Sequence, residues 1–148
     1  MADLLFYHLE TQPLERVLPQ LVEKTLERGW RAVIETASPE RAEVLDSLLW
    51  TFREDSFVPH GTAGTDVDAD QPVLITTEAD NPNGAHVRFF VDRAVPQSTE
   101  GYERVVFMFS GHDPDAVTEA RVAWKALQVG NALTYWQQDD AGRWVKKG

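Results

Sequence analysis

Four side chains near the C-terminus combine the residue types that can bind the carboxylate end of another protein chain. Val117, Arg121, Trp124 and Lys125 follow one another at intervals of four, three and one residues. On a helix this spacing places two cations one turn apart beside an indole. Such a group can receive a carboxylate and an apolar side chain together. Periodicity alone favours a plainer interpretation, an amphipathic helix with Trp124 in the core and Arg121 and Lys125 in solvent.

A second group is aromatic and follows a predicted helix. Trp50 and Phe52 precede the run Phe57-Val58-Pro59, with charged residues between them. Aromatic side chains dominate the hot spots of protein interfaces, so this segment can be an exposed docking patch. It can equally be the edge of the core, and the sequence is compatible with both interpretations.

Residue patterns typical of catalysis or metal binding are not recognisable. The four histidines lack metal-ligand spacing on any predicted helix. Ser110-Gly111-His112 follows a predicted strand, where open α/β sheets bind ligands, but no nucleophile or acid is identifiable beside it. The run from Asp66 to Asp70 resembles the start of a calcium loop, yet Gln71 stands where that loop needs glycine. We therefore expect no catalytic residue, no metal and no cofactor.

Alternating apolar runs and helical repeats predict an α/β fold. Strands are expected at 4–9, 30–35, 73–76, 87–91 and 104–109, and helices at 14–26, 39–49 and 114–133. The opening strand–helix–strand–helix order indicates a parallel sheet, while Asn83-Gly84 favours a hairpin-like connection between the third and fourth strands. We expect three layers, a mostly parallel central sheet of about five strands flanked by helices, in a Rossmann-like topology.

The loop that a nucleotide site on this fold would need is missing. Glu10-Thr11-Gln12-Pro13 follows the first strand and has no glycine, whereas a phosphate cradle needs glycine so that backbone N–H groups can approach the phosphates. A nucleotide-binding enzyme on a Rossmann-like fold stays as an alternative, and the missing loop counts against it.

Length and charge narrow the class of protein further. The 148 residues suit a single domain, 1–148, and the chain has no cysteine. We expect a cytoplasmic protein without a membrane partner, because no signal peptide or membrane span is visible. The net charge is −10, all of it before residue 113. Such a body repels a phosphate backbone, although direct single-stranded DNA binding through the last helix, Lys146 and Lys147 stays open.

Several motifs occur in a fixed order along the whole chain. They are Phe6-Tyr7-His8-Leu9, Leu45-Asp46-Ser47-Leu48-Leu49-Trp50, Ser56-Phe57-Val58-Pro59-His60, Ala120-Arg121, Trp124-Lys125 and Gly130-Asn131. Together they resemble the chi subunit family of bacterial DNA polymerase III, and Pro72-Val73 fits its α-proteobacterial-like members. The resemblance implies a non-catalytic accessory subunit of the clamp-loader assembly, with any polymerase activity belonging to the holoenzyme.

The resemblance also implies a first partner and its site. This partner is single-stranded DNA-binding protein, whose acidic C-terminal tail ends in phenylalanine. Arg121 and Lys125 match the residues that receive the carboxylates of the tail, while Val117 and Trp124 would line the pocket for its terminal side chain. The family usually has tyrosine where this chain has Trp124. DNA would be reached only indirectly, through this partner.

A second partner is implied at the aromatic segment. Phe57 matches the aromatic residue that docks the psi subunit of the polymerase, and Trp50, Phe52, Val58 and Pro59 would support that surface. A helicase is the alternative partner at the same surface.

Overall fold

The computed structural model places most of the chain in one α/β unit. It describes residues 3–51, 61–62, 71–77, 81, 83–91, 94, 101–129 and 131–147, with the side chains of residues 50 and 51 left out. The elements are β1 (Asp3–Leu9), α1 (Leu14–Glu27), β2 (Ala32–Glu35), α2 (Pro39–Thr51), β3 (Gly61–Thr62), β4 (Val73–Thr76), β5 (Val87–Phe90), β6 (Arg104–Ser110), α3 (Pro114–Leu127), β7 (Ala132–Gln138) and β8 (Trp144–Lys146).

All strands belong to one sheet, in the order β3-β4-β2-β5-β6-β1-β7-β8. Every neighbouring pair is parallel except β7 and β8, which are antiparallel. The α/β class and the mostly parallel sheet are therefore confirmed. The expected number of about five strands is wrong, because the described sheet has eight, and its order differs from the 3-2-1-4-5-6 order of the Rossmann fold.

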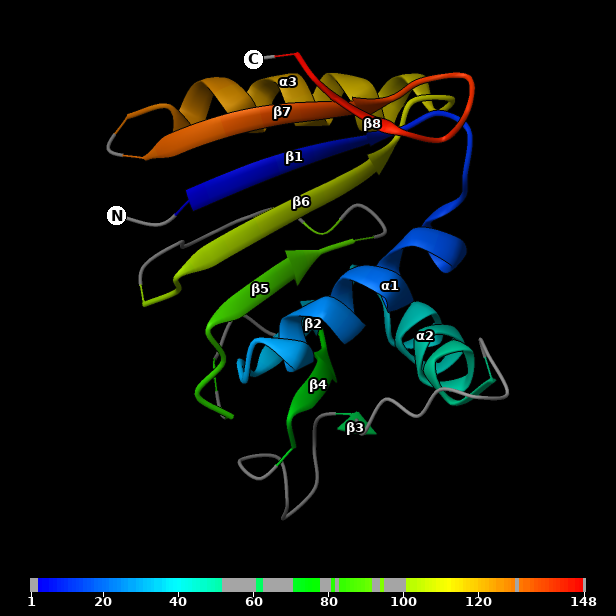
Figure 1. Cartoon of the computed structure of the whole chain (residues 1–148), viewed down its shortest axis with the longest axis vertical. Helices are drawn as coiled ribbons and strands as arrows, with labels where there is room; N and C mark the ends of the chain where they lie inside the picture. The colour runs from blue at the N-terminus through cyan, green and yellow to red at the C-terminus, as the bar shows by residue number, and fades with distance from the viewer. Residues whose placement is uncertain are drawn as a thin grey trace.

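Helices cover both faces of the sheet, so the molecule has three layers (Figure 1). Helices α1 and α2 pack on one face through Val17, Leu18, Val22, Leu45 and Leu49, all buried. Helix α3 packs on the other face, against Leu4 and Phe6 of β1 and alternate residues of β6. Parallel sheets need cover on both faces because their strands are apolar on both sides.

Local signals account for where the helices begin and end. Asp113 caps α3 by accepting hydrogen bonds from the backbone N–H groups of Asp115 and Ala116, with Pro114 in the first turn. Helix α1 runs through the buried Pro19 without ending there, and stops where Gly29 takes a φ of 79°.

The connection expected at Asn83-Gly84 is not a hairpin. Strands β4 and β5 do not pair, since each lies parallel to β2 on opposite sides of it. The buried Asn83 amide donates to the carbonyl oxygens of Ala32 and Gln71, both at 3.0 Å, which holds the turn at the amino ends of β2 and β4. The turn therefore leads into a new parallel strand rather than back along the old one.

The helix expected to run to about residue 133 ends at Leu127, and β7 begins at Ala132. The side-chain amide of Asn131 donates to the Leu127 carbonyl oxygen at 3.0 Å, which satisfies one of the last carbonyls of the helix. Thr134, Tyr135 and Trp136 have β-branched or aromatic side chains that favour a strand. Pairing with β1 therefore takes precedence over the apolar spacing that continued from α3.

One ion pair lies inside the sheet layer. The Arg88 guanidinium donates from Nε to Oε1 of Glu35 at 3.1 Å and from Nη2 to the same oxygen, and it also donates to the Tyr102 hydroxyl at 2.9 Å. The Arg88 side chain is 1% exposed and that of Glu35 is 10% exposed. Two charges so far from water stabilise the fold only while both are present.

No helix among the described residues is both long and apolar enough to cross a membrane.

Replacing one member of this pair should destabilise the protein strongly. We expect Arg88→Leu to lower the free energy of unfolding by about 3–5 kcal/mol, because the Glu35 carboxylate stays buried after it loses both hydrogen bonds from the Arg88 guanidinium. Urea unfolding measures the change. The double substitution Arg88→Leu with Glu35→Leu should recover much of the loss, and Arg143→Leu, at an exposed arginine, should change little. A loss below about 1 kcal/mol for Arg88→Leu would contradict this account.

Candidate functional site

The four residues proposed for tail binding lie together on α3. Val117, Arg121, Trp124 and Lys125 line a single cavity of about 320 Å³. Its remaining lining comes from Ala120 and from Tyr135 of β7. The helical spacing thus brings the predicted residues to one place, and their binding role stays a prediction.

Small residues let α3 approach the sheet and leave this cavity beside it. Ala116, Ala120 and Ala123 are buried against β1 and β6. Trp124 is half-buried, with its ring edge-on to Phe6 at 5.2 Å between centroids and to Tyr135 at 5.8 Å. The indole therefore belongs to the core and to the cavity at once, so the two interpretations of Trp124 are compatible.

The two cations at the mouth of the cavity are exposed and uncompensated. Arg121 and Lys125 lie one turn apart on the outer side of α3. Neither forms an ion pair with any described part of the chain. Their positive charge is therefore available to a ligand that carries carboxylates.

Tyr135 is the lining residue that the sequence analysis missed. Its hydroxyl lies 2.6 Å from Nδ1 of His8, and Nε2 of His8 lies 2.6 Å from Oε1 of Glu10. Burial raises the pKa of Tyr135, an effect that the nearby Arg121 opposes and Glu10 reinforces. The hydroxyl therefore stays protonated at neutral pH, and its hydrogen bond with Nδ1 of His8 fixes the ring that forms one wall of the cavity.

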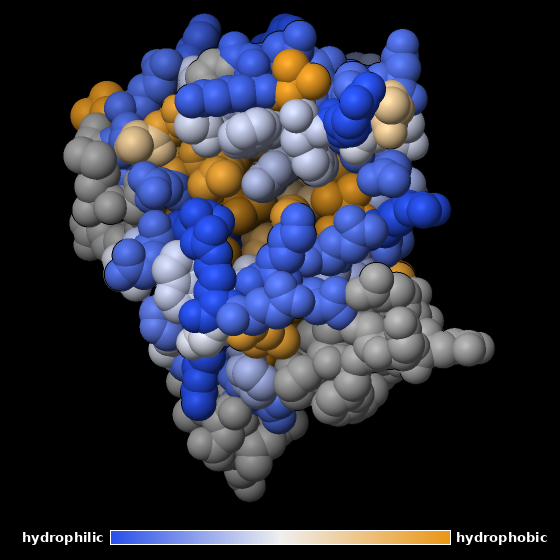
Figure 2. All heavy atoms as spheres, viewed as in Figure 1, coloured by the Kyte–Doolittle hydropathy of each residue, from blue (hydrophilic) through white to orange (hydrophobic). Residues whose placement is uncertain are grey.

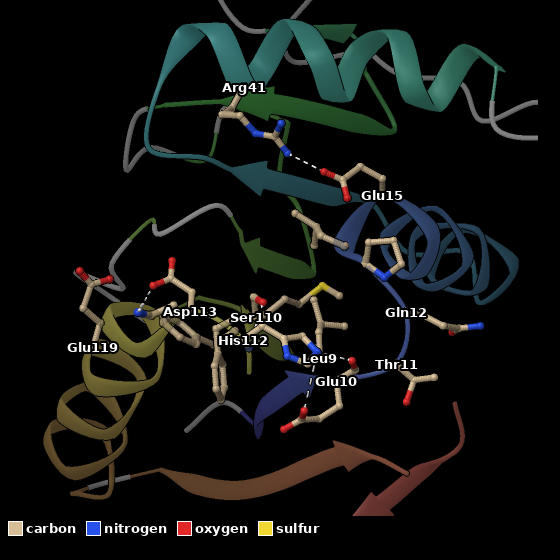
Figure 3. Close-up of a pocket in the computed structure, with 16 residues that line it drawn as sticks. Leu9, Glu10, Thr11, Gln12, Glu15, Arg41, Ser110, His112, Asp113 and Glu119 are labelled. Carbon is tan, nitrogen blue, oxygen red and sulfur yellow. Dashed lines mark hydrogen bonds and ion pairs between the residues drawn. The ribbon is translucent and has the colours of Figure 1, made fainter. Parts of the chain in front are cut away.

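A larger cavity, of about 630 Å³, opens at the carboxyl ends of β1 and β6 (Figure 3). Strand β1 leads through α1 to β2 on one side, whereas β6 leads through α3 to β7 on the other. Open α/β sheets bind ligands at such a reversal of direction. Ser110 and His112 of the predicted Ser110-Gly111-His112 segment line this cavity, as do Glu10 and Asp113.

Three backbone donors of the loop after β1, whose residues line this cavity, are already bonded within the chain. The backbone N–H groups of Glu10, Thr11 and Gln12 all donate to Oε1 of Gln138, at 3.0, 3.1 and 3.0 Å. Gln138 comes from the end of β7 and is 4% exposed. Three donors that could cradle a phosphate therefore already have an internal acceptor, which counts against a nucleotide site here.

Several polar side chains around this cavity make contacts within the chain. Oε1 of Glu15 accepts from Arg41 at 3.0 Å, as Figure 3 shows, and Asp113 caps α3. Nε2 of His112 lies 2.5 Å from the carbonyl oxygen of Glu10, not against the hydroxyl of Ser110. Within the described residues, no group of three or more potential ligands is placed to hold a metal ion.

Of the five residues of the predicted docking segment, only Trp50 lies among the residues that the structure describes. Trp50 lies near the end of α2, with its side chain outside the description. Phe52, Phe57, Val58 and Pro59 lie outside the described residues. Whether this segment is an exposed patch or the edge of the core stays a prediction.

Comparisons with known proteins point to one family. The family model described as DNA polymerase III chi subunit, HolC, matches residues 1–133. The probable DNA polymerase III subunit chi of Rickettsia prowazekii (strain Madrid E) is 33% identical over 87 residues, 59% of this chain and 53% of that protein. The DNA polymerase III subunit chi of Pseudomonas aeruginosa is 33% identical over 60 residues, 40% of this chain and 41% of that protein. The matched part thus spans about half the length of these relatives, or less.

Removing the Gln138 acceptor should loosen the loop after β1. We expect Gln138→Leu to lower the free energy of unfolding by about 1–3 kcal/mol, because it leaves three part-buried backbone donors without their acceptor. Amide hydrogen exchange should accelerate at residues 10–12, as NMR can measure. Gln138→Glu keeps an acceptor and should preserve slow exchange, and Gln128→Leu, at an exposed position, is the control. Unchanged exchange at residues 10–12 in Gln138→Leu would contradict the assignment.

Proposed function

The chain belongs to the DNA polymerase III chi subunit family, and we propose that it is a non-catalytic accessory subunit that links the polymerase to single-stranded DNA-binding protein. In this proposal the α3 cavity binds the acidic, Phe-ended C-terminal tail of that protein. A second surface, for the psi subunit or a helicase, would comprise Trp50, Phe52, Phe57, Val58 and Pro59. The observation that carries the proposal is the cavity lined by Arg121, Lys125 and Trp124.

The size and lining of the cavity suit the end of a peptide. About 320 Å³ lies at the lower end of ligand-pocket volumes, enough for one aromatic side chain rather than a whole cofactor. Val117, Trp124 and Tyr135 offer that side chain apolar contact. Arg121 and Lys125 at the rim would then receive the terminal carboxylate and the acidic residues before it.

The distribution of charge supports this choice of surface. The 148 residues carry a net charge of −10, so most of the molecule repels an acidic peptide. Residues 113–148, which include α3, carry five basic and five acidic side chains and are neutral overall. An acidic tail therefore meets less repulsion at α3 than the net charge of the whole chain suggests.

The affinity of this site should be modest. Both cations are exposed, so water and salt weaken their attraction for the tail. A protein that presents several such tails would compensate through multivalent binding, since each further contact becomes intramolecular. A weak individual contact also allows the polymerase to exchange partners.

The bonds from the loop after β1 to the Gln138 side chain support a role without catalysis. Gln138 takes the backbone donors that a nucleotide would need, and His112 is bonded away from Ser110. Binding is then the function that the described surfaces serve best.

A tail peptide should bind to α3 in a charge-dependent way. We expect a peptide with an acidic C-terminus ending in phenylalanine to bind the full chain, and Arg121→Ala to weaken binding at least about tenfold through the loss of a charge-assisted contact. Isothermal titration calorimetry at two salt concentrations measures both effects, and affinity should fall as salt rises.

Matched controls separate this site from general charge effects. Arg16→Ala removes an exposed arginine from α1 and should leave affinity unchanged. A peptide without its terminal phenylalanine should bind poorly even to the unaltered chain. Equal affinities of Arg121→Ala and Arg16→Ala would reject the α3 site.

Single substitutions should impair binding at the two proposed surfaces independently. We expect Phe57→Ala to reduce capture of the psi subunit or helicase from cell extract, while the chain still binds the tail peptide with unchanged affinity. Arg121→Ala should show the reverse pattern. Quantitative pull-down with both variants in parallel makes the comparison. Loss of both partners from either single variant, in a protein that stays folded by circular dichroism, would refute two independent surfaces.

A further inference from the structure

A third cavity lies between α1 and the sheet, at the amino ends of β5 and β6. Its volume is about 190 Å³. It is on the face of the sheet opposite α3. From the viewpoint of Figure 1, Figure 2 shows apolar side chains gathered in a hollow on this face, bordered by hydrophilic ones. The lining residues are Tyr7, Leu21, Lys24, Thr25, Arg28, Trp30, Val87, Phe89, Arg104 and Val106.

The charged side chains that line this cavity are all positive. Lys24 and Arg28 come from the last turn of α1 and its cap, and Arg104 begins β6. None of the three forms an ion pair with another described residue. In a chain with 24 acidic and 14 basic side chains, three cations gathered without a carboxylate indicate a place for an anion from outside.

Trp30 holds two of these cations in position. The guanidinium carbon of Arg28 lies 5.1 Å from the centroid of the Trp30 ring, and that of Arg104 lies 5.7 Å from it. The His86 ring stacks on the same indole at 6.1 Å with an interplanar angle of 14°. Because the indole already orders both guanidinium groups, less conformational entropy is lost when they bind an anion.

Tyr7 contributes a hydroxyl group to the cavity. Burial raises its pKa, and the positive charge of Arg104 acts in the opposite direction, which places the guanidinium near the phenol. The hydroxyl is therefore protonated at neutral pH and available to donate a hydrogen bond.

A purely structural role explains part of this cluster only. Cations in the last turn of a helix interact favourably with its negative end, which suits Lys24 and Arg28. Arg104 belongs to a strand from a distant part of the sequence, so the helix end does not account for it. Its approach to Trp30 and Tyr7 joins it to the other two cations.

We propose that this cavity binds the doubly charged phosphate group of a small molecule. Three cations match a dianion better than a single carboxylate, and guanidinium groups donate in pairs to phosphate oxygens. The volume is below that of ordinary cofactor pockets, so it suits a phosphate head group rather than a whole nucleotide. Because α1 and α3 lie on opposite faces, this binding is independent of the proposed tail site.

The test is an NMR titration of the full chain with inorganic pyrophosphate. The indole N–H signal of Trp30 should shift in a saturable way, while that of Trp124 should not move. Arg104→Ala and Arg28→Ala should each raise the dissociation constant at least about tenfold, and Arg16→Ala, on the same helix as Lys24, should leave it unchanged. Acetate at equal ionic strength should produce no saturable shift of the Trp30 signal.

Two further titrations identify the source of the phosphate. Inorganic phosphate should compete with pyrophosphate at Trp30, whereas single-stranded DNA without a terminal phosphate should not. Saturation by such DNA alone would overturn the proposal in favour of a nucleic-acid backbone. The absence of a saturable shift with pyrophosphate, or equal affinity in Arg104→Ala, would overturn the site itself.

Discussion

The alternation of side chains along β1 governs what each face of this molecule can do. Strand β1 is paired on both sides, with β6 and β7, so its register is held by two rows of hydrogen bonds. Phe6 points toward α3 and supports Trp124, while Tyr7 points toward α1 and lines the cationic cavity. A slip of one residue would exchange these faces and dismantle both cavities. The two proposed binding surfaces thus depend on one strand.

Local features of the fold were predictable from sequence, and features that depend on distant pairing were not. Pro39 and Pro114 begin their helices as expected, and the four-residue spacing from Val117 to Arg121 holds on α3, because caps and helical periodicity act within a few residues. The strand content was underestimated in part because β7 depends on pairing with the distant β1 and with β8. For the same reason, the sequence did not predict Tyr135 as a lining residue, because its place beside Trp124 depends on that pairing.

The larger cavity lies where open α/β sheets bind ligands, while backbone donors beside it are already bonded within the chain. Its location follows from the opposite directions of the two connections after β1 and β6, which is a property of chain topology. Its ability to hold a phosphate depends on free backbone donors, and the Gln138 side chain engages three of them. Gly111, between the lining residues Ser110 and His112, is required for close packing rather than for phosphate binding. A Cβ at Gly111 would lie 2.1 Å from Nε2 of His8, so that position packs against the imidazole ring that bonds the Tyr135 hydroxyl.

The two ends of the sheet are its shortest strands, β3 with two residues and β8 with three. An edge strand exposes unpaired backbone groups to which a strand from another molecule can add. Edges this brief offer few such groups, and Lys146 on β8 would bring positive charge against an incoming copy. Within the described residues, the broad sheet therefore gives a second copy of the chain little backbone to pair with edge to edge.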